Sequence, residues 1–233
     1  MGKVTQHARP PALLLGALLS ITAFLALATP AAQQRWFDAE RVMRDQVGLV
    51  RGPALGDAMV AVSALGQASG LVPLIVLVSL LLWRGRRPWA LTLPLVMAGT
   101  GVLQLAAKWA VDRPRPNLAP WGFPSGHVLS LVVFFGLLVY VLHAVRARRA
   151  WRWLSVTGGA GVVLAVAFSR LYLDVHWLSD VAGGFALGLA YLLFAVWLVE
   201  GQRRRRRTKP AEAAVETPPV VAEPEPLGRL AGV

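Results

Sequence analysis

The chain has 233 residues, of which 56% are apolar and only 15% are charged, and its mean hydropathy is +0.55. Ordinary soluble domains carry about a quarter charged residues, so this composition argues against a soluble globular enzyme. The net charge is +12, but the basic residues lie between hydrophobic runs rather than on one solvated face. This distribution argues against a nucleic-acid-binding protein. The absence of cysteine excludes disulfides, thiolate zinc sites and thiol catalysis.

Six segments lack Asp, Glu, Lys and Arg over lengths that can cross a bilayer. A membrane-spanning helix needs about 17–25 predominantly apolar residues. We therefore predict an all-α, polytopic membrane protein in which six transmembrane helices form a bundle. In chain order the six segments are Ala12–Thr29, Ala58–Trp83, Pro88–Ala107, Val128–Val145, Trp153–Ser169 and Val181–Val199.

Lysine and arginine residues in the short loops predict the orientation of these spans. With a cytoplasmic N-terminus, sixteen of the 24 Lys and Arg residues lie in cytoplasmic segments and eight on the opposite side. The reverse orientation would place the run Arg203–Arg207 outside. We therefore expect a multi-pass protein of the cell membrane with its C-terminal tail in the cytoplasm.

Four parts follow from this pattern. Residues 1–32 hold the first span, interpreted as a retained signal anchor because eighteen apolar residues are long for a signal peptide. A basic start and an Ala-Leu-Ala sequence also fit a cleaved signal peptide. Residues 33–57 are an extracytoplasmic connector, either an amphipathic helix on the membrane surface or a solvated segment. Residues 58–199 are a core with five spans, and residues 200–233 are a basic and then disordered cytoplasmic tail.

Three polar clusters lie at span ends, and the predicted topology puts all of them on the extracytoplasmic side. The first is residues 108–116, K-W-A-V-D-R-P-R-P, and the second is residues 124–127, P-S-G-H. The third runs from Ser169-Arg170 to His176 and Asp180. Ionisable residues at membrane spans are expensive and therefore indicate function. Because the clusters share one side, we expect them to converge on a site.

The residue types in these clusters suit a phosphate. The cations are Lys108, Arg113, Arg115 and Arg170, and the arginine fork matches phosphate oxygens. Ser125 and Gly126 open the fourth span, where the free N–H groups of a helix N-terminus bind anions. The glycine also permits close approach of the backbone to a ligand.

Two histidines complete the predicted site. His176 and Asp180 are four residues apart and share a face if the sixth helix begins by residue 176. A carboxylate bonded to one ring nitrogen fixes the tautomer and leaves the other as a nucleophile or base. His127 follows the Ser-Gly turn, so two histidines with different neighbours can divide nucleophilic and general-acid work. No metal-ligand set surrounds either histidine, so we expect no metal and no other cofactor.

Each of these residues also has a simpler interpretation when it is taken singly. The histidines could lie at the membrane interface, and the basic residues could anchor span ends. Asp180 could interact favourably with the dipole at a helix N-terminus. Their combination favours a site. We interpret Asp112, Arg113 and Asp174 as ordinary residues of the membrane interface.

The three clusters resemble the three-part signature of the type-2 phosphatidic acid phosphatase superfamily, which also contains vanadium haloperoxidases. That pattern is K-x6-R-P, P-S-G-H and S-R-x5-H-x3-D, and the chain matches every fixed position within about residues 55–200. The resemblance implies a metal-independent phosphatase in which His176 attacks phosphorus to form a phosphohistidine. It implies that Asp180 orients His176 and that His127 protonates the leaving alkoxide and then activates water. The residues implied to hold the phosphoryl oxygens are Lys108, Arg115, Ser125, Gly126 and Arg170.

The resemblance also implies a membrane lipid phosphate as substrate. Candidates are phosphatidic acid, phosphatidylglycerol phosphate and undecaprenyl pyrophosphate. The topology expected from the loop charges places the active site at the extracytoplasmic end of the bundle. A vanadate-dependent haloperoxidase is opposed by the six spans, because those relatives are larger soluble proteins. A non-enzymatic lipid-binding or transport protein is opposed by the lack of repeats and mid-span charges. The expected partners are the bilayer and its lipid phosphates, without nucleic acid.

Overall fold

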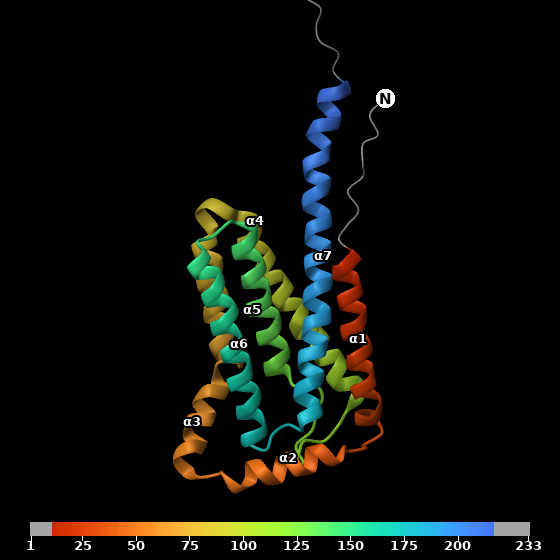
Figure 1. Ribbon diagram of the computed structural model, residues 1–233, viewed down its shortest axis with the longest axis vertical. Coiled ribbons are helices and arrows are strands. Elements are labelled where there is room, and N and C mark those ends of the chain that lie inside the picture. The colour runs from red at the N-terminus through yellow and green to blue at the C-terminus, as the bar shows by residue number, and fades with distance from the viewer. Residues whose placement is uncertain (1–10, 217–233) are drawn as a thin grey trace, which may run out of the picture. The chain divides into compact units, whose positions relative to one another are not determined.

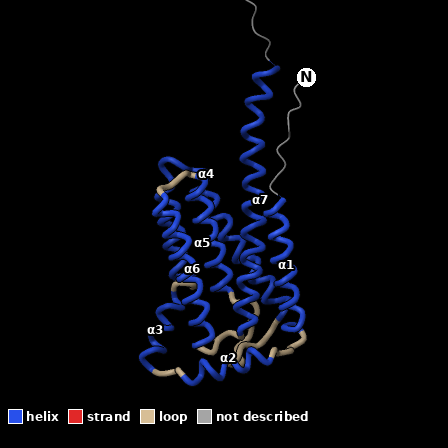
Figure 2. Tube along the Cα trace, in the orientation of Figure 1, coloured by secondary structure: helices blue, strands red, loops and turns tan. Residues whose placement is uncertain are grey.

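The computed structural model describes residues 11–216, with side chains as far as residue 203. All secondary structure in this part of the chain is helical, which confirms the predicted all-α fold (Figures 1 and 2). The described residues form two compact units that divide between Trp197 and Leu198. The helices are α1 (Pro11–Ala32), α2 (Asp38–Leu49), α3 (Pro53–Ala64), α4 (Ala68–Val111), α5 (Gly126–Ala144), α6 (Arg149–Tyr172) and α7 (Leu178–Glu216).

Helix α4 contains two of the predicted spans. Its backbone leaves the helical region at Arg86, with φ −148° and ψ 42°, and Pro88 follows without an N–H to continue the ladder. The chain reverses direction at this point (Figure 1). Five helices within the described residues are long and apolar enough to cross a membrane, and α4 counts among them once. With its two halves counted separately, these helices match the six predicted segments.

The second span begins later than its apolar segment predicts. Residues 58–64 belong to the short apolar helix α3, and a turn at residues 65–67 separates them from α4. A side chain at Gly66 would bring its Cβ within 2.9 Å of the Cβ of His127. The turn therefore rests against the predicted second histidine, and the span proper starts at Ala68.

Helix α5 forms the core of the bundle. Leu129, Val133 and Leu137 on this helix are completely buried, and α5 packs against both α4 and α6. Large apolar side chains on α4, such as Leu81, Leu95 and Val102, are instead exposed on the outside. That distribution suits a bundle surrounded by lipid, where apolar groups face outward and backbone polar groups are satisfied within helices.

The two ends of the bundle differ in their connections. One end, here called the histidine end, holds residues 112–125 and 173–177, with α2 lying across it (Figure 1). The opposite end, here called the turn end, holds the break at Arg86 and the α5–α6 turn at residues 145–148. All three predicted polar clusters lie at the histidine end.

Parts of the predicted connector and of the predicted tail are helical. Helix α2 buries Glu40 and Val47 on one side and exposes Val42 and Leu49. Helix α7 continues to Glu216, past the residue at which we placed the start of the tail. Residues 200–216 of the tail predicted to be disordered are therefore helical, and residues 217–233 lie outside the described part of the chain.

Candidate active site

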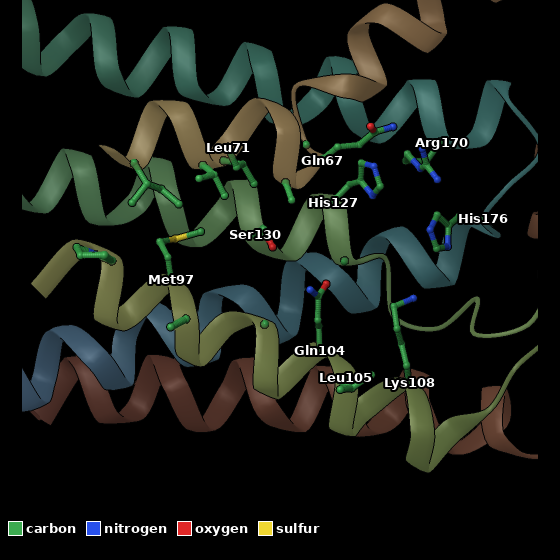
Figure 3. Close-up of a pocket in the computed structure, with 18 of the residues that line it drawn as sticks. Gln67, Leu71, Met97, Gln104, Leu105, Lys108, His127, Ser130, Arg170 and His176 are labelled. Atoms are coloured by element: carbon green, nitrogen blue, oxygen red, sulfur yellow. The ribbon is translucent and has the colours of Figure 1, made fainter. Parts of the chain in front are cut away.

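A cavity of about 840 Å³ lies at the histidine end between α4, α5 and α6 (Figure 3). Apolar side chains from both halves of α4, among them Leu71, Met97 and Leu105, form its wall toward the middle of the bundle. Ser125 and Asp180 do not line the cavity but contact residues that do. The predicted site residues that line it are Lys108, Arg115, Gly126, His127, Arg170 and His176. The structure therefore brings the three sequence clusters to one place.

His176 lies in the loop before α7 rather than on the helix, because α7 begins at Leu178. Its Nδ1 is nevertheless 3.3 Å from Asp180 Oδ2, and the same oxygen accepts the N–H of Trp177 at 2.9 Å. Asp180 thus reaches back from the first turn of α7. When Nδ1–H donates to the carboxylate, Nε2 keeps its lone pair. Burial lowers the pKa of His176 to about 4 despite the opposing effect of Asp180, so the ring is neutral at neutral pH.

His127 comes from the first turn of α5 and differs from His176 in its surroundings. Its Nε2 is buried, and no hydrogen-bond partner is found for it in the described part of the chain. The rings of His127 and His176 project into the same region of the cavity (Figure 3). An unpartnered buried nitrogen of this kind is suited to a ligand atom that arrives with the substrate.

Two of the cations at the cavity have hydrogen-bond donors without a partner among the described residues. The Arg170 guanidinium donates to the Ser63 hydroxyl of α3, while its Nε is buried without a partner among the described residues. The Nε of Arg115 is also buried and has no hydrogen-bond partner among the described residues. Lys108 lies in the last turn of α4 and donates from Nζ to the carbonyl of Trp121 at 2.6 Å. Guanidinium groups with free donors match the oxygens of a phosphate.

The start of α5 supplies backbone donors. Ser125 precedes the helix, its N–H donates to the carbonyl of Asp180 at 2.8 Å, and its hydroxyl is buried without a partner in the described chain. A Cβ on Gly126 would lie 2.0 Å from Gln104 Oε1. A larger residue would therefore displace the amide of Gln104 from the cavity wall.

Arg113 is buried beside Asp180, so its interpretation as an ordinary residue of the membrane interface is wrong. Its side chain is 0% exposed, and its Nη1 donates to Asp180 Oδ1 at 3.0 Å. Its Nη2 pairs with Glu40 of α2 at 2.9 Å. The R-P-R-P sequence held a signal for Arg113, but no sequence spacing relates residue 40 to residue 113.

Asp174, in contrast, behaves as an interfacial residue of the histidine end. It accepts from Arg44 at 2.7 Å and from Arg51 at 3.1 Å. The hydrogen bond from Arg44 lowers the pKa of Asp174 below its ordinary value. These partly exposed pairs fasten the segment around α2 to the loop that carries His176.

The assembled groups are suited to phosphoryl transfer. A neutral imidazole is oriented by a buried carboxylate, a second imidazole lies nearby, and three cations with helix N–H groups surround the space between them. Among the described residues, no group of three or more His, Cys, Asp and Glu side chains could hold a metal ion.

Comparisons with known proteins agree with this chemistry. The profile of the PAP2 superfamily matches residues 89–204. Phosphatidylglycerophosphatase B of Bacillus subtilis is 34% identical over 187 residues, which cover 76% of this chain and 90% of that protein. An undecaprenyl-diphosphatase of Sulfolobus acidocaldarius is 29% identical over 58% of this chain and 66% of its own.

A solved structure has the same fold. The crystal structure described as the first transmembrane PAP2 type phosphatidylglycerolphosphate phosphatase from Bacillus subtilis aligns with a TM-score of 0.70 and 26% identity. The alignment covers 80% of this chain and 96% of that one. The extent of both matches, together with the three converging motifs, shows that the chain is a multi-pass membrane protein that belongs to the PAP2 superfamily.

Proposed function

We propose that the protein is a metal-independent lipid phosphatase that works through a phosphohistidine intermediate. The observation that carries the proposal is the contact of His176 Nδ1 with Asp180 Oδ2 at 3.3 Å, beside a cavity lined with cations. Relatives named phosphatidylglycerophosphatase and undecaprenyl-diphosphatase support the reaction class. The apolar wall of the cavity supports a substrate with a lipid stem.

The reaction has two steps. In the first, Nε2 of His176 attacks phosphorus, the bond from phosphorus to the lipid oxygen breaks, and His127 gives its proton to that oxygen. In the second, His127 takes a proton from water, the hydroxide attacks phosphorus, and inorganic phosphate leaves His176. Lys108, Arg115 and Arg170 stabilise the charge on the phosphoryl oxygens in both steps.

The substrate is a phosphomonoester or a diphosphate of a membrane lipid. The test is a phosphate-release panel with purified protein in detergent, with chelator present, on phosphatidic acid, phosphatidylglycerol phosphate and undecaprenyl pyrophosphate. We expect release from at least one of them. Activity that vanished with chelator and returned with Mg²⁺ or Zn²⁺ would contradict the mechanism.

The roles of the two histidines can be separated with an aryl phosphate, whose leaving group needs little protonation. His127→Ala should still form a labelled protein adduct on a rapid-quench timescale but turn over lipid phosphate poorly. His176→Ala should form no adduct. An adduct in His176→Ala and none in His127→Ala would exchange the two assignments.

The histidine end faces the extracytoplasmic side in this proposal, as the basic residues of the loops indicate. Because the natural chain has no cysteine, single cysteines report sidedness directly. A membrane-impermeant thiol reagent should label Ala119→Cys on intact cells and leave Arg86→Cys unlabelled. The opposite pattern would invert the topology.

A further inference from the structure

A buried line of ionisable side chains runs from His176 to helix α2. His176 contacts Asp180, Asp180 contacts Arg113, and Arg113 contacts Glu40. All four are at most 4% exposed, although Glu40 belongs to a helix outside the membrane spans. Arg113 and Glu40 do not line the main cavity, so neither is placed to touch a bound phosphate.

The geometry joins both carboxylates to one guanidinium. Arg113 Nη1 lies 3.0 Å from Asp180 Oδ1 and 3.4 Å from Glu40 Oε1, and Nη2 lies 2.9 Å from Glu40 Oε2. Glu40 Oε1 also accepts the N–H of Ser179 at 3.1 Å and the hydroxyl of the same residue. Glu40 therefore holds both the cation beside Asp180 and the backbone directly before it.

The charges in this line matter for the reaction. One cation and two anions leave a net charge of one negative unit beside His176. The His176 ring gains positive charge as it attacks phosphorus, and a negative group held beside it stabilises that charge. Without Glu40, Arg113 would cancel the charge of Asp180. Without Arg113, two carboxylates would be buried together with no cation between them.

We propose that Glu40 and Arg113 are positioning residues that act on His176 through Asp180. Arg113 fixes the Asp180 carboxylate, and Glu40 offsets the charge of Arg113 so that Asp180 keeps its full effect on the His176 ring. The inference rests on the proposed function, since it concerns the same nucleophile. It also gives helix α2 a part in the reaction although α2 lies outside the three sequence motifs.

The test is a double-mutant cycle of Arg113→Gln and Glu40→Gln, with kcat and KM measured on an aryl phosphate. We expect Arg113→Gln to lower kcat about 100-fold and Glu40→Gln about tenfold, with KM within about twofold of wild type. The double variant restores the net charge of the natural line. Its kcat should exceed that of Arg113→Gln by about tenfold. Losses that multiply, as for two independent structural defects, would overturn the proposal.

Two further measurements keep the result decisive. Arg41→Gln removes an exposed charge from α2 that forms no hydrogen bond or ion pair within residues 11–203, so it should leave kcat unchanged. If Arg113→Gln does not fold, Glu40→Gln decides alone: wild-type kcat in that variant would overturn the inference. A wild-type protein that releases no phosphate would instead refute the proposed function, so the two failures are distinct.

Discussion

Two arginines at the histidine end and two at the turn end of the bundle differ in burial. At the histidine end, Arg113 and Arg170 are buried and hydrogen-bonded to side chains from distant helices. At the turn end, Arg86 and Arg149 are exposed, and neither forms an ion pair with a residue in the described part of the chain. A buried charge is expensive unless it is paired or used, whereas an exposed one at a span end is an ordinary anchor. For these four arginines, burial rather than charge separates the pair beside the cavity from the pair at the turn end.

The strongest way to break this comparison is to remove one histidine from each end. His176→Ala should reduce phosphate release to the background rate for every substrate, because no phosphoenzyme can form. His143→Ala, at the end of α5 on the turn end, should keep wild-type activity, since its Nδ1 contacts only the carbonyl of Val139. Inorganic phosphate release in detergent measures both. Equal losses in the two variants would erase the distinction between the ends.

Asp180→Asn should have the next largest effect. The amide keeps the shape of the carboxylate but donates toward Nδ1, which favours the wrong imidazole tautomer. The loss in kcat is expected to be on the order of 10⁴-fold, as for the orienting aspartate of a Ser-His-Asp triad. Steady-state kinetics on an aryl phosphate measure it. Near-normal turnover would show that Asp180 serves the start of α7 rather than the reaction.

A pair of arginine variants sharpens the comparison directly. Arg115→Gln removes a cation whose buried Nε has no partner among the described residues, so kcat/KM should fall about 10²- to 10³-fold. Arg149→Gln removes an exposed arginine from the turn end and should change kcat/KM by less than about twofold. Comparable losses would mean that exposure does not discriminate between these residues.

The pH dependence should give the smallest of these effects. His176 must be neutral to attack, and burial lowers its pKa to about 4, so the limb of kcat/KM that reports this histidine should lie near pH 4 and fall roughly tenfold per unit below it. In the unfolded chain the same histidine titrates near 6.5 and binds more protons between these two values. Stability should therefore fall as the pH drops from about 6.5 to 4. An acid limb near pH 6.5 that is assigned to the His176 ring itself would contradict the burial of His176.

Much of this arrangement could be predicted from local patterns. The apolar segments identified the spans because a bilayer dictates their length. The motifs identified the residues around the cavity because each motif fixes a short stretch of backbone at a span end. His127 and Gly126 are neighbours in sequence, so their common position at the start of α5 needed no knowledge of tertiary structure.

The remainder depends on contacts between distant segments. Glu40 meets Arg113 only because α2 lies across the histidine end, and no periodicity in residues 33–57 reveals that orientation. The turn at Gly66 likewise packs against His127, which is 61 positions away in the chain. An apolar segment cannot reveal a break that packs against a neighbouring helix.

The apolar wall of the cavity determines how a lipid would meet this protein. Three residues of α4 both line the cavity and are about half exposed on the outside of the bundle: Val72, Val76 and Leu105. Moving a chain of about fifteen CH₂ groups into water would cost roughly 12 kcal/mol. A lipid that approaches sideways along α4 avoids that cost. For such a substrate the relevant concentration is a mole fraction in the membrane, so diluting the lipid with inert phospholipid should slow the reaction even when its bulk concentration is constant.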